Sequence, residues 1–150
     1  MAEPVRTYLE AIVHQLPCRP IHGADGSVYL YRYTLRDLDD GGHVYLHRFM
    51  RSDEDQELHN HPWSAQSLIL AGGYCEERRA GDRVVESIYI PGSLVVIAPD
   101  TFHRFDLLEH DCWSLCTVGP RVQDWGFWDR HSGAFTQWEE FVRRKGMVPA

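Results

Sequence analysis

Leu58-His59-Asn60-His61-Pro62-Trp63 and Pro99-Asp100-Thr101-Phe102-His103 carry the strongest structural signal in this sequence. Side chains along a β-strand repeat with a period of two, so two histidines separated by one residue lie on the same face. A third histidine, brought in from a strand far along the chain, would complete a set of three nitrogen ligands. Such a set leaves coordination positions open, as metal catalysis requires. The pattern therefore predicts a metal-dependent enzyme that uses His59, His61 and His103 as ligands.

The sequence around these two stretches favours β-structure. Between about residues 26 and 118, short runs rich in β-branched and aromatic residues alternate with turn signals such as Asp39-Asp40-Gly41-Gly42. Residues 93–97 are nearly all apolar, which predicts a strand buried on both faces. Many short strands at close spacing are typical of a sandwich or barrel. The predicted strands are 26–33, 43–50, 66–70, 74–79, 83–90, 93–97, 103–107 and 112–118.

Each end of the chain predicts one short helix. Apolar residues recur at spacings of three and four over about residues 5–16, and Pro17 ends this pattern. A second helix is predicted over about residues 137–145. Thr136 and Glu139 form a capping box at its start, and Gly146 would end it.

Size and composition indicate a single domain over residues 1–150. The chain has 43% hydrophobic and 25% charged residues, and a formal net charge of −7 argues against a nucleic-acid partner. No apolar run approaches the ~20 residues that cross a bilayer, and no signal peptide is evident, so no membrane partner is expected. The four cysteines form no CxxC pair, which favours free thiols in a reducing cytoplasm.

At these residues the chain resembles the cupin superfamily over about residues 43–118. The first cupin motif is matched by His59-x-His61, Gln66 and Gly73, and the second by Pro91-Gly92, Pro99 and His103. The resemblance implies an all-β double-stranded β-helix, or jelly-roll barrel, with its core at about residues 26–118. It also implies a homodimer, since many small cupins pair edge strands or exchange terminal segments.

The main departure from the cupin pattern is Gln66, which stands where the family has an acidic ligand. Gln66 could coordinate a metal weakly, or it could hydrogen-bond to a ligand of a three-histidine site of the kind known among cupin dioxygenases. Glu57 lies two residues before His59 and shares its face by strand parity. It could supply the missing carboxylate or orient an imidazole, although exposure in the polar loop is the commoner fate of such an acid.

An arginine beside the site could grip a substrate carboxylate with two hydrogen bonds. Of Arg48, Arg51, Arg104 and Arg121, the last is preferred, because it follows Gly119-Pro120 at the end of a core strand. His43 and His47 share one strand face, so either could point inward, although a surface or structural role is commoner. The aromatic residues Trp63, Trp113, Trp125, Phe127 and Trp128 either wall a substrate pocket or pack the C-terminal segment.

The favoured function is a mononuclear non-haem Fe(II) oxygenase that acts on a small organic molecule, with Gln66, Glu57 and Arg121 as further active-site residues. A neutral three-nitrogen set with open positions suits Fe(II), and Zn, Mn or Ni are the other candidates. A metal-dependent lyase, isomerase or decarboxylase of the same fold is one alternative. A non-catalytic small-molecule-binding protein is the other.

Overall fold

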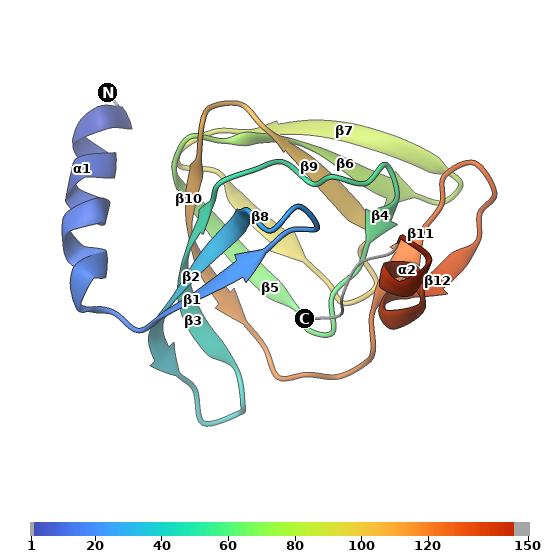
Figure 1. Cartoon of the computed structure of the whole chain (residues 1–150), viewed down its shortest axis with the longest axis horizontal. Coiled ribbons are helices and arrows are strands. Elements are labelled where there is room, and N and C mark those ends of the chain that lie inside the picture. Colours follow the sequence, from blue (N-terminus) through green and yellow to red (C-terminus); the bar gives the residue numbers. More distant parts are fainter. Residues whose placement is uncertain (1, 146–150) are drawn as a thin grey trace.

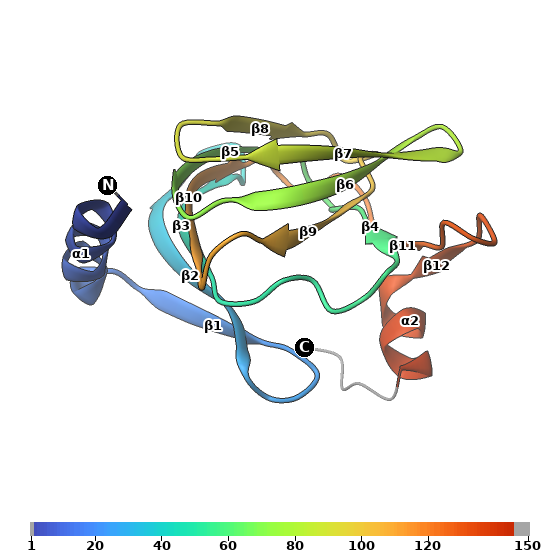
Figure 2. The same cartoon turned by 90° about the horizontal axis from the view of Figure 1, so that it is seen from above.

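Two antiparallel sheets of six strands face one another across an apolar interior (Figures 1 and 2). The computed structural model describes residues 2–145. The first sheet has the order β1 (Cys18–His22), β2 (Val28–Asp37), β3 (His43–Phe49), β10 (Cys112–Val118), β5 (Ala65–Ala71) and β8 (Leu94–Ile97). The second has the order β12 (Phe135–Gln137), β11 (Gly126–Trp128), β4 (Leu58–His59), β9 (His103–Leu107), β6 (Tyr74–Ala80) and β7 (Arg83–Tyr89).

The interior is filled by alternate side chains of both sheets, as expected for strands with one buried face. Phe49 of β3 contacts Phe105 of β9 across the interior, with ring centroids 4.9 Å apart. Cys116 and Val118 of β10 belong to the same buried cluster. All four cysteines are free thiols. These contacts identify which face of each strand points inward, and the site is built on that face.

The two terminal helices lie at opposite ends of the barrel (Figure 1). α1 (Ala2–Ile12) continues into the 3-10 helix η1 (Val13–Gln15) and packs through Leu9 against an outer cluster that contains Leu46 and Trp113. Arg6 of α1 donates to the buried Asp111 at 2.7 Å, which ties the helix to the sheet. Within the described residues, neither helix is long and apolar enough to cross a membrane.

The all-β architecture was predicted correctly, but β1, β11 and β12 were missed, and β4 was expected only as the strand that would carry the histidine pair. β1 is an edge strand that contains Pro20, which is tolerated there because an edge leaves N–H groups unpaired. β11 and β12 have only three residues each, too few to show a clear alternation. They extend the second sheet beyond β4, and β11 lies next to His59.

Two local predictions were wrong. β8 is not buried on both faces, because it is an edge strand whose Leu94 and Val96 are 58% and 55% exposed. The N-cap of α2 (Trp138–Arg144) is Gln137, whose side chain accepts from the backbone N–H groups of Glu139 and Glu140. Thr136 cannot cap this helix because it is paired within β12. The predicted stop at Gly146 lies outside the described residues.

Candidate metal centre

Three histidines from distant parts of the chain meet at the inner side of the second sheet. His59, His61 and His103 each offer a ring nitrogen, and these atoms lie within 4.8 Å of one another. The Nε2 atoms of His61 and His103 are 3.1 Å apart. Two nitrogens each about 2.0–2.1 Å from one ion, at roughly 90–110°, would lie about 2.9–3.4 Å apart. The donor set thus has the spacing of a divalent metal site.

Strand pairing brings the imidazoles together. His59 is directly opposite His103 in the β4–β9 ladder, so their side chains share a face. β4 ends at His59, and His61 lies just beyond it rather than on the same regular strand. The buried Asn60 fixes this exit, since its Oδ1 accepts from Gly126 N–H at 2.8 Å.

Gln123 joins the two sequence stretches that carry the histidines. Its Nε2 donates to the carbonyl oxygens of His61 at 2.9 Å and Pro99 at 2.6 Å. No pattern in the sequence predicted this contact, because Gln123 belongs to neither motif. The side chain holds the segment after β4 against the segment that leads into β9.

The environment keeps the ring nitrogens of His59 and His61 unprotonated. Burial, together with the neighbouring histidines, lowers the pKa of His61 to about 3 and the pKa of His59 well below its ordinary value. These two imidazoles are therefore neutral at pH 7, with a lone pair available to a metal ion. Imidazole nitrogens are good ligands for a divalent transition metal.

Glu76 orients His103, a role that the sequence analysis missed. The carboxylate is fully buried and accepts from His103 Nδ1 at 2.8 Å, which directs Nε2 of that ring toward the other histidines. Arg78 donates to both oxygens of Glu76, at 2.8 and 3.2 Å. Burial acts to raise the pKa of Glu76, but the hydrogen bonds from His103 and Arg78 outweigh it and hold the pKa below its ordinary value. Such carboxylate–histidine pairs fix the orientation of metal ligands.

The only feature of the sequence that pointed to Glu76 was its place in the alternation of β6, which puts its side chain on the inner face. Glu76 is directly opposite Phe105, an inward-facing residue of β9, and Arg78 is directly opposite His103. The partner strand was not known from sequence, so this juxtaposition could not be derived. An acid in an inward position of a strand is nevertheless unusual, because acids are rarely fully buried without partners.

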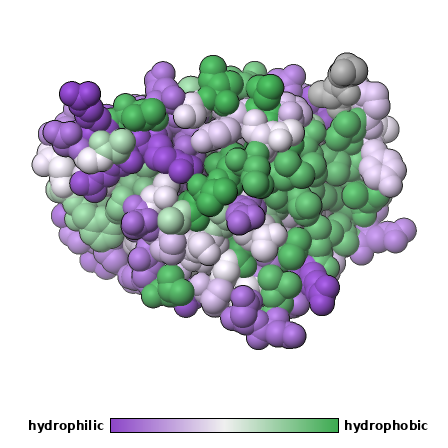
Figure 3. Space-filling model, turned by 180° about the vertical axis from the view of Figure 1, so that it is seen from behind, coloured by the Kyte–Doolittle hydropathy of each residue, from purple (hydrophilic) through white to green (hydrophobic). Residues whose placement is uncertain are grey.

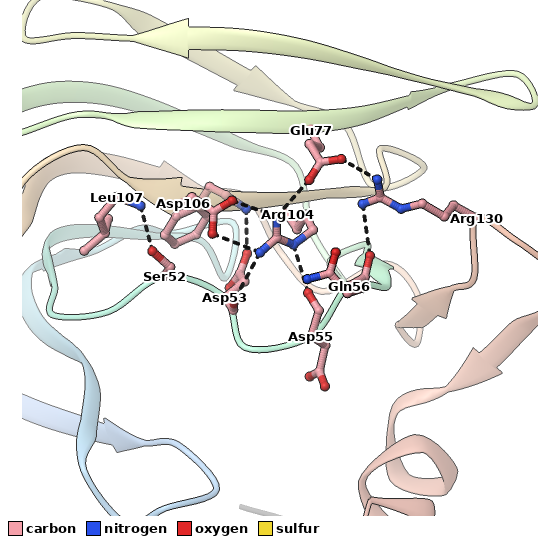
Figure 4. A network of polar contacts seen from close by, with 10 residues as sticks. Ser52, Asp53, Asp55, Gln56, Glu77, Arg104, Asp106, Leu107 and Arg130 are labelled. Atoms are coloured by element: carbon pink, nitrogen blue, oxygen red, sulfur yellow. Dashed lines mark hydrogen bonds and ion pairs between the residues drawn. The ribbon is translucent and has the colours of Figure 1, made fainter.

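A second polar network anchors the loop that leads to the histidine pair (Figure 4). Arg104 donates to Glu77 and Asp106 and to the backbone carbonyls of Asp53 and Asp55, at 2.8–3.2 Å. Asp53 in turn accepts from Phe105 N–H at 2.9 Å. Because it follows His103 directly in β9, Arg104 points away from the histidines. It pins the loop against β9, the strand that carries His103.

Aromatic side chains surround the histidine rings. Trp63 stacks on His61 with centroids 6.1 Å apart, and Trp125 and Phe127 contact the edge of His59 at 6.4 and 6.2 Å. Phe127 also packs on Phe141 of α2, so it serves both the site and the C-terminal segment. Trp113 lies elsewhere, in the outer cluster beneath α1.

Gln66 is not brought to the histidines. It is directly opposite Val96 and Thr117, and all three side chains are exposed on the outer face of the first sheet. The inward-facing residues of β5 are those of the opposite parity, such as Ala65 and Ile69. A one-residue offset in the motif thus directs the amide away from the site.

Glu57 and Arg121 also lie apart from the cluster. The carboxylate of Glu57 is 3.8 Å from Nζ of Lys145, and its side chain lines a cavity of about 190 Å³ with Phe127 and Phe141. Arg121 is exposed, with Nη2 3.3 Å from Oδ1 of Asp124. Neither has a described contact with a histidine of the cluster.

Comparisons with known proteins give matches at the level of structure. No protein-family model matches the sequence, and a search of curated proteins finds no match. A structure of Fe(II)-HppE with the alternative substrate (S)-1-HPP has a TM-score of 0.56 and 12% identity, over 71% of this chain and 57% of that one. The chain therefore spans little more than half the length of this neighbour.

Two further structural neighbours have similar TM-scores. KdgF from Halomonas sp. has a TM-score of 0.55 and 16% identity, over 72% of this chain and 91% of that one. A structure reported for the DMSP lyases RdDddP and RnDddQII has a TM-score of 0.62 and 14% identity, over 83% of this chain and 68% of that one. These neighbours are cupin-fold proteins. With its two facing antiparallel sheets and a histidine cluster on an inner face, the chain has the cupin fold.

Proposed function

We propose that this protein is a mononuclear metal-dependent enzyme, and more specifically a non-haem Fe(II) oxygenase of a small organic molecule. The observation that carries the proposal is the close approach of three imidazoles, with two Nε2 atoms 3.1 Å apart. Neutral nitrogen ligands that leave open positions suit Fe(II), while Zn, Mn and Ni are the competing ions. The Fe(II)-HppE neighbour provides a precedent for iron in this fold.

The residues around the histidines support catalysis in distinct ways. A divalent ion held by His59, His61 and His103 would supply Lewis acidity and, if it were iron, electrons for reaction with O₂. Glu76 fixes the tautomer and direction of His103. Trp63, Trp125 and Phe127 shield the imidazoles from water, and in a drier site electrostatic interactions with the substrate are stronger.

The second candidate function is a metal-dependent lyase, isomerase or decarboxylase. The specific observation in its favour is the likeness to the DMSP lyase structure, which covers 83% of this chain. In this case the site serves Lewis-acid chemistry, and a protein side chain removes a proton from the substrate. The two functions differ in whether O₂ is consumed.

Metal content is the direct test of the site. We expect protein produced without a chelating tag to contain about one first-row transition metal per chain by elemental analysis. His61→Ala and His103→Ala should lose the metal, whereas His14→Ala, a change to an exposed histidine of η1, should retain it. Equal metal content in all three variants would overturn the assignment of the ligands.

Oxygen uptake separates the two candidate reactions. Fe(II)-loaded protein would be incubated with a panel of small organic acids, and O₂ consumption and substrate loss would be followed together. The oxygenase proposal expects loss of substrate to stop under anaerobic conditions. Turnover that continues unchanged without O₂ would favour the lyase-type reaction.

The homodimer implied by the cupin resemblance remains a proposal. A broad hydrophobic area occupies one face of the molecule (Figure 3). On the outer face of the first sheet, Leu115 and Leu94 flank Leu68 at one register level, and both flanking residues are substantially exposed. A second copy covering this face would bury these leucines.

A further inference from the structure

Arg32 of β2 points into the barrel interior. It is directly opposite His47 in the β2–β3 ladder, so the two side chains share a face. Phe49 is on the same face of β3, two residues from His47, and packs on Phe105 in the core. The half-buried guanidinium of Arg32 and the buried His47 therefore face the second sheet.

The guanidinium is held in place by uncharged groups. Its Nε donates to His47 Nε2 at 3.1 Å, and its Cζ lies 4.7 Å from the ring centroid of Tyr45. To accept this bond His47 must be neutral, and burial followed by the charge of Arg32 lowers the pKa of His47 to about 3. These contacts use Nε and one face of the guanidinium, and no described bond uses either Nη group.

Arg32 has no carboxylate partner among residues 2–145. Its neighbour across the β1–β2 ladder is Arg19, a second positive charge. Like charges directly opposite one another destabilise a sheet, and burial lowers the pKa of Arg32. By contrast, the other arginines considered as carboxylate grips all have acidic partners: Arg48, Arg51, Arg104 and Arg121.

The histidine cluster and Arg32 share one interior. His47, the hydrogen-bond partner of Arg32, packs on Phe49 with ring centroids 5.6 Å apart, and Phe49 packs on Phe105, which shares the inner face of β9 with His103. Arg32 projects from the first sheet and the histidines from the second. A small molecule bound at the histidines from the interior side would thus meet the guanidinium.

We propose that Arg32 binds an oxyanion of the substrate, with its two Nη groups donating to two oxygens. The substrate class is then a small organic anion that carries a carboxylate or phosphonate at the end away from the reacting atoms. An arginine fork matches both groups, and the bound anion would supply the missing counter-charge. This inference rests on the proposed function, because it identifies the residue that binds the end of the substrate remote from the metal centre.

Calorimetric titration of the metal-loaded protein with acetate, sulfate and methylphosphonate, at constant ionic strength, tests the inference. We expect one oxyanion to bind per chain and Arg32→Gln to weaken that binding by about tenfold or more. The matched control is Arg36→Gln, which removes an exposed arginine from the same strand and should leave the affinity unchanged. Preference for acetate would assign a carboxylate substrate, and preference for methylphosphonate would assign a phosphonate.

Two results would overturn the inference: equal affinity in Arg32→Gln and wild type, or an equal loss in Arg36→Gln. Arg32→Lys keeps the charge but not the fork and should bind more weakly than wild type, which provides a test should the glutamine variant not fold. The same titration on His61→Ala separates this inference from the proposed function. Arg32-dependent binding that persists in this metal-free variant supports the oxyanion site, even if the wild type proves to contain no metal.

Discussion

Arg104 and Arg32 differ in whether neighbouring acidic groups compensate their positive charge. Arg104 is 4% exposed, donates to Glu77, Asp106 and two backbone carbonyls, and has its pKa raised by those partners (Figure 4). Arg32 donates to a neutral histidine and has its pKa lowered by burial. The first charge is compensated within the chain, whereas the second is not.

The difference separates an arginine that stabilises the fold from one that is held ready for a ligand. A half-buried charge without an acidic partner costs stability, so a structural role does not explain Arg32. Strain and uncompensated charge tend to occur at functional sites, where a ligand completes the interaction. Arg32 lies on the sheet that faces the histidine cluster across the barrel interior, which agrees with this interpretation.

The largest expected effect comes from replacing each arginine with methionine. Arg104→Met would remove a donor from Glu77, which keeps Arg130 as a partner, and from the backbone carbonyls of Asp53 and Asp55, so we expect the free energy of unfolding to fall by about 3 kcal/mol. Arg32→Met removes a charge with no acidic partner, so stability should be unchanged or higher. Urea unfolding of both variants and wild type measures the contrast.

Equal destabilisation by the two changes would break the comparison, because it would give Arg32 a structural role of the same weight. Arg36→Met provides the baseline for losing an exposed arginine from β2, with an expected change within about 0.5 kcal/mol.

Arg78 is an intermediate case, because its carboxylate partner, Glu76, also contacts a predicted ligand. We expect Glu76→Gln to weaken metal binding by about 10–100-fold, equivalent to about 1.4–2.7 kcal/mol, since the amide holds His103 less firmly in its ligating orientation. Competition with a chelator measures the affinity.

Glu86→Gln is the matched control, since it neutralises an exposed glutamate on the neighbouring strand β7. An equal fall in affinity for both variants would mean that general charge, and not the contact with His103, is responsible.

The sequence was sufficient for those parts of the molecule that depend on local pattern. Alternation and turn residues predicted most strands, and the spacing of His59, His61 and His103 predicted residues that the fold brings together. Glu76 could not be predicted, because its contact with His103 depends on which strands pair and in which register.

Arg32 could not be predicted from the sequence either, because its significance depends on a contact that is absent and not on one that is made. Its importance lies in the lack of an acidic partner, and partners are known only once the chain is folded. Gln66 shows how motif reasoning can mislead, since one residue of register moves a side chain to the other face of a sheet.

The smallest effect is expected at Arg121, the arginine that sequence analysis favoured for binding substrate. Its ion pair with Asp124 is exposed and three residues apart, and such pairs contribute about 0–1 kcal/mol. We expect Arg121→Ala to change the free energy of unfolding by about 0.5 kcal/mol or less and to leave acetate and methylphosphonate affinities unchanged. A tenfold loss of oxyanion affinity in this variant, with the affinity of Arg32→Gln unchanged, would show that Arg121 binds the substrate anion and that Arg32 does not.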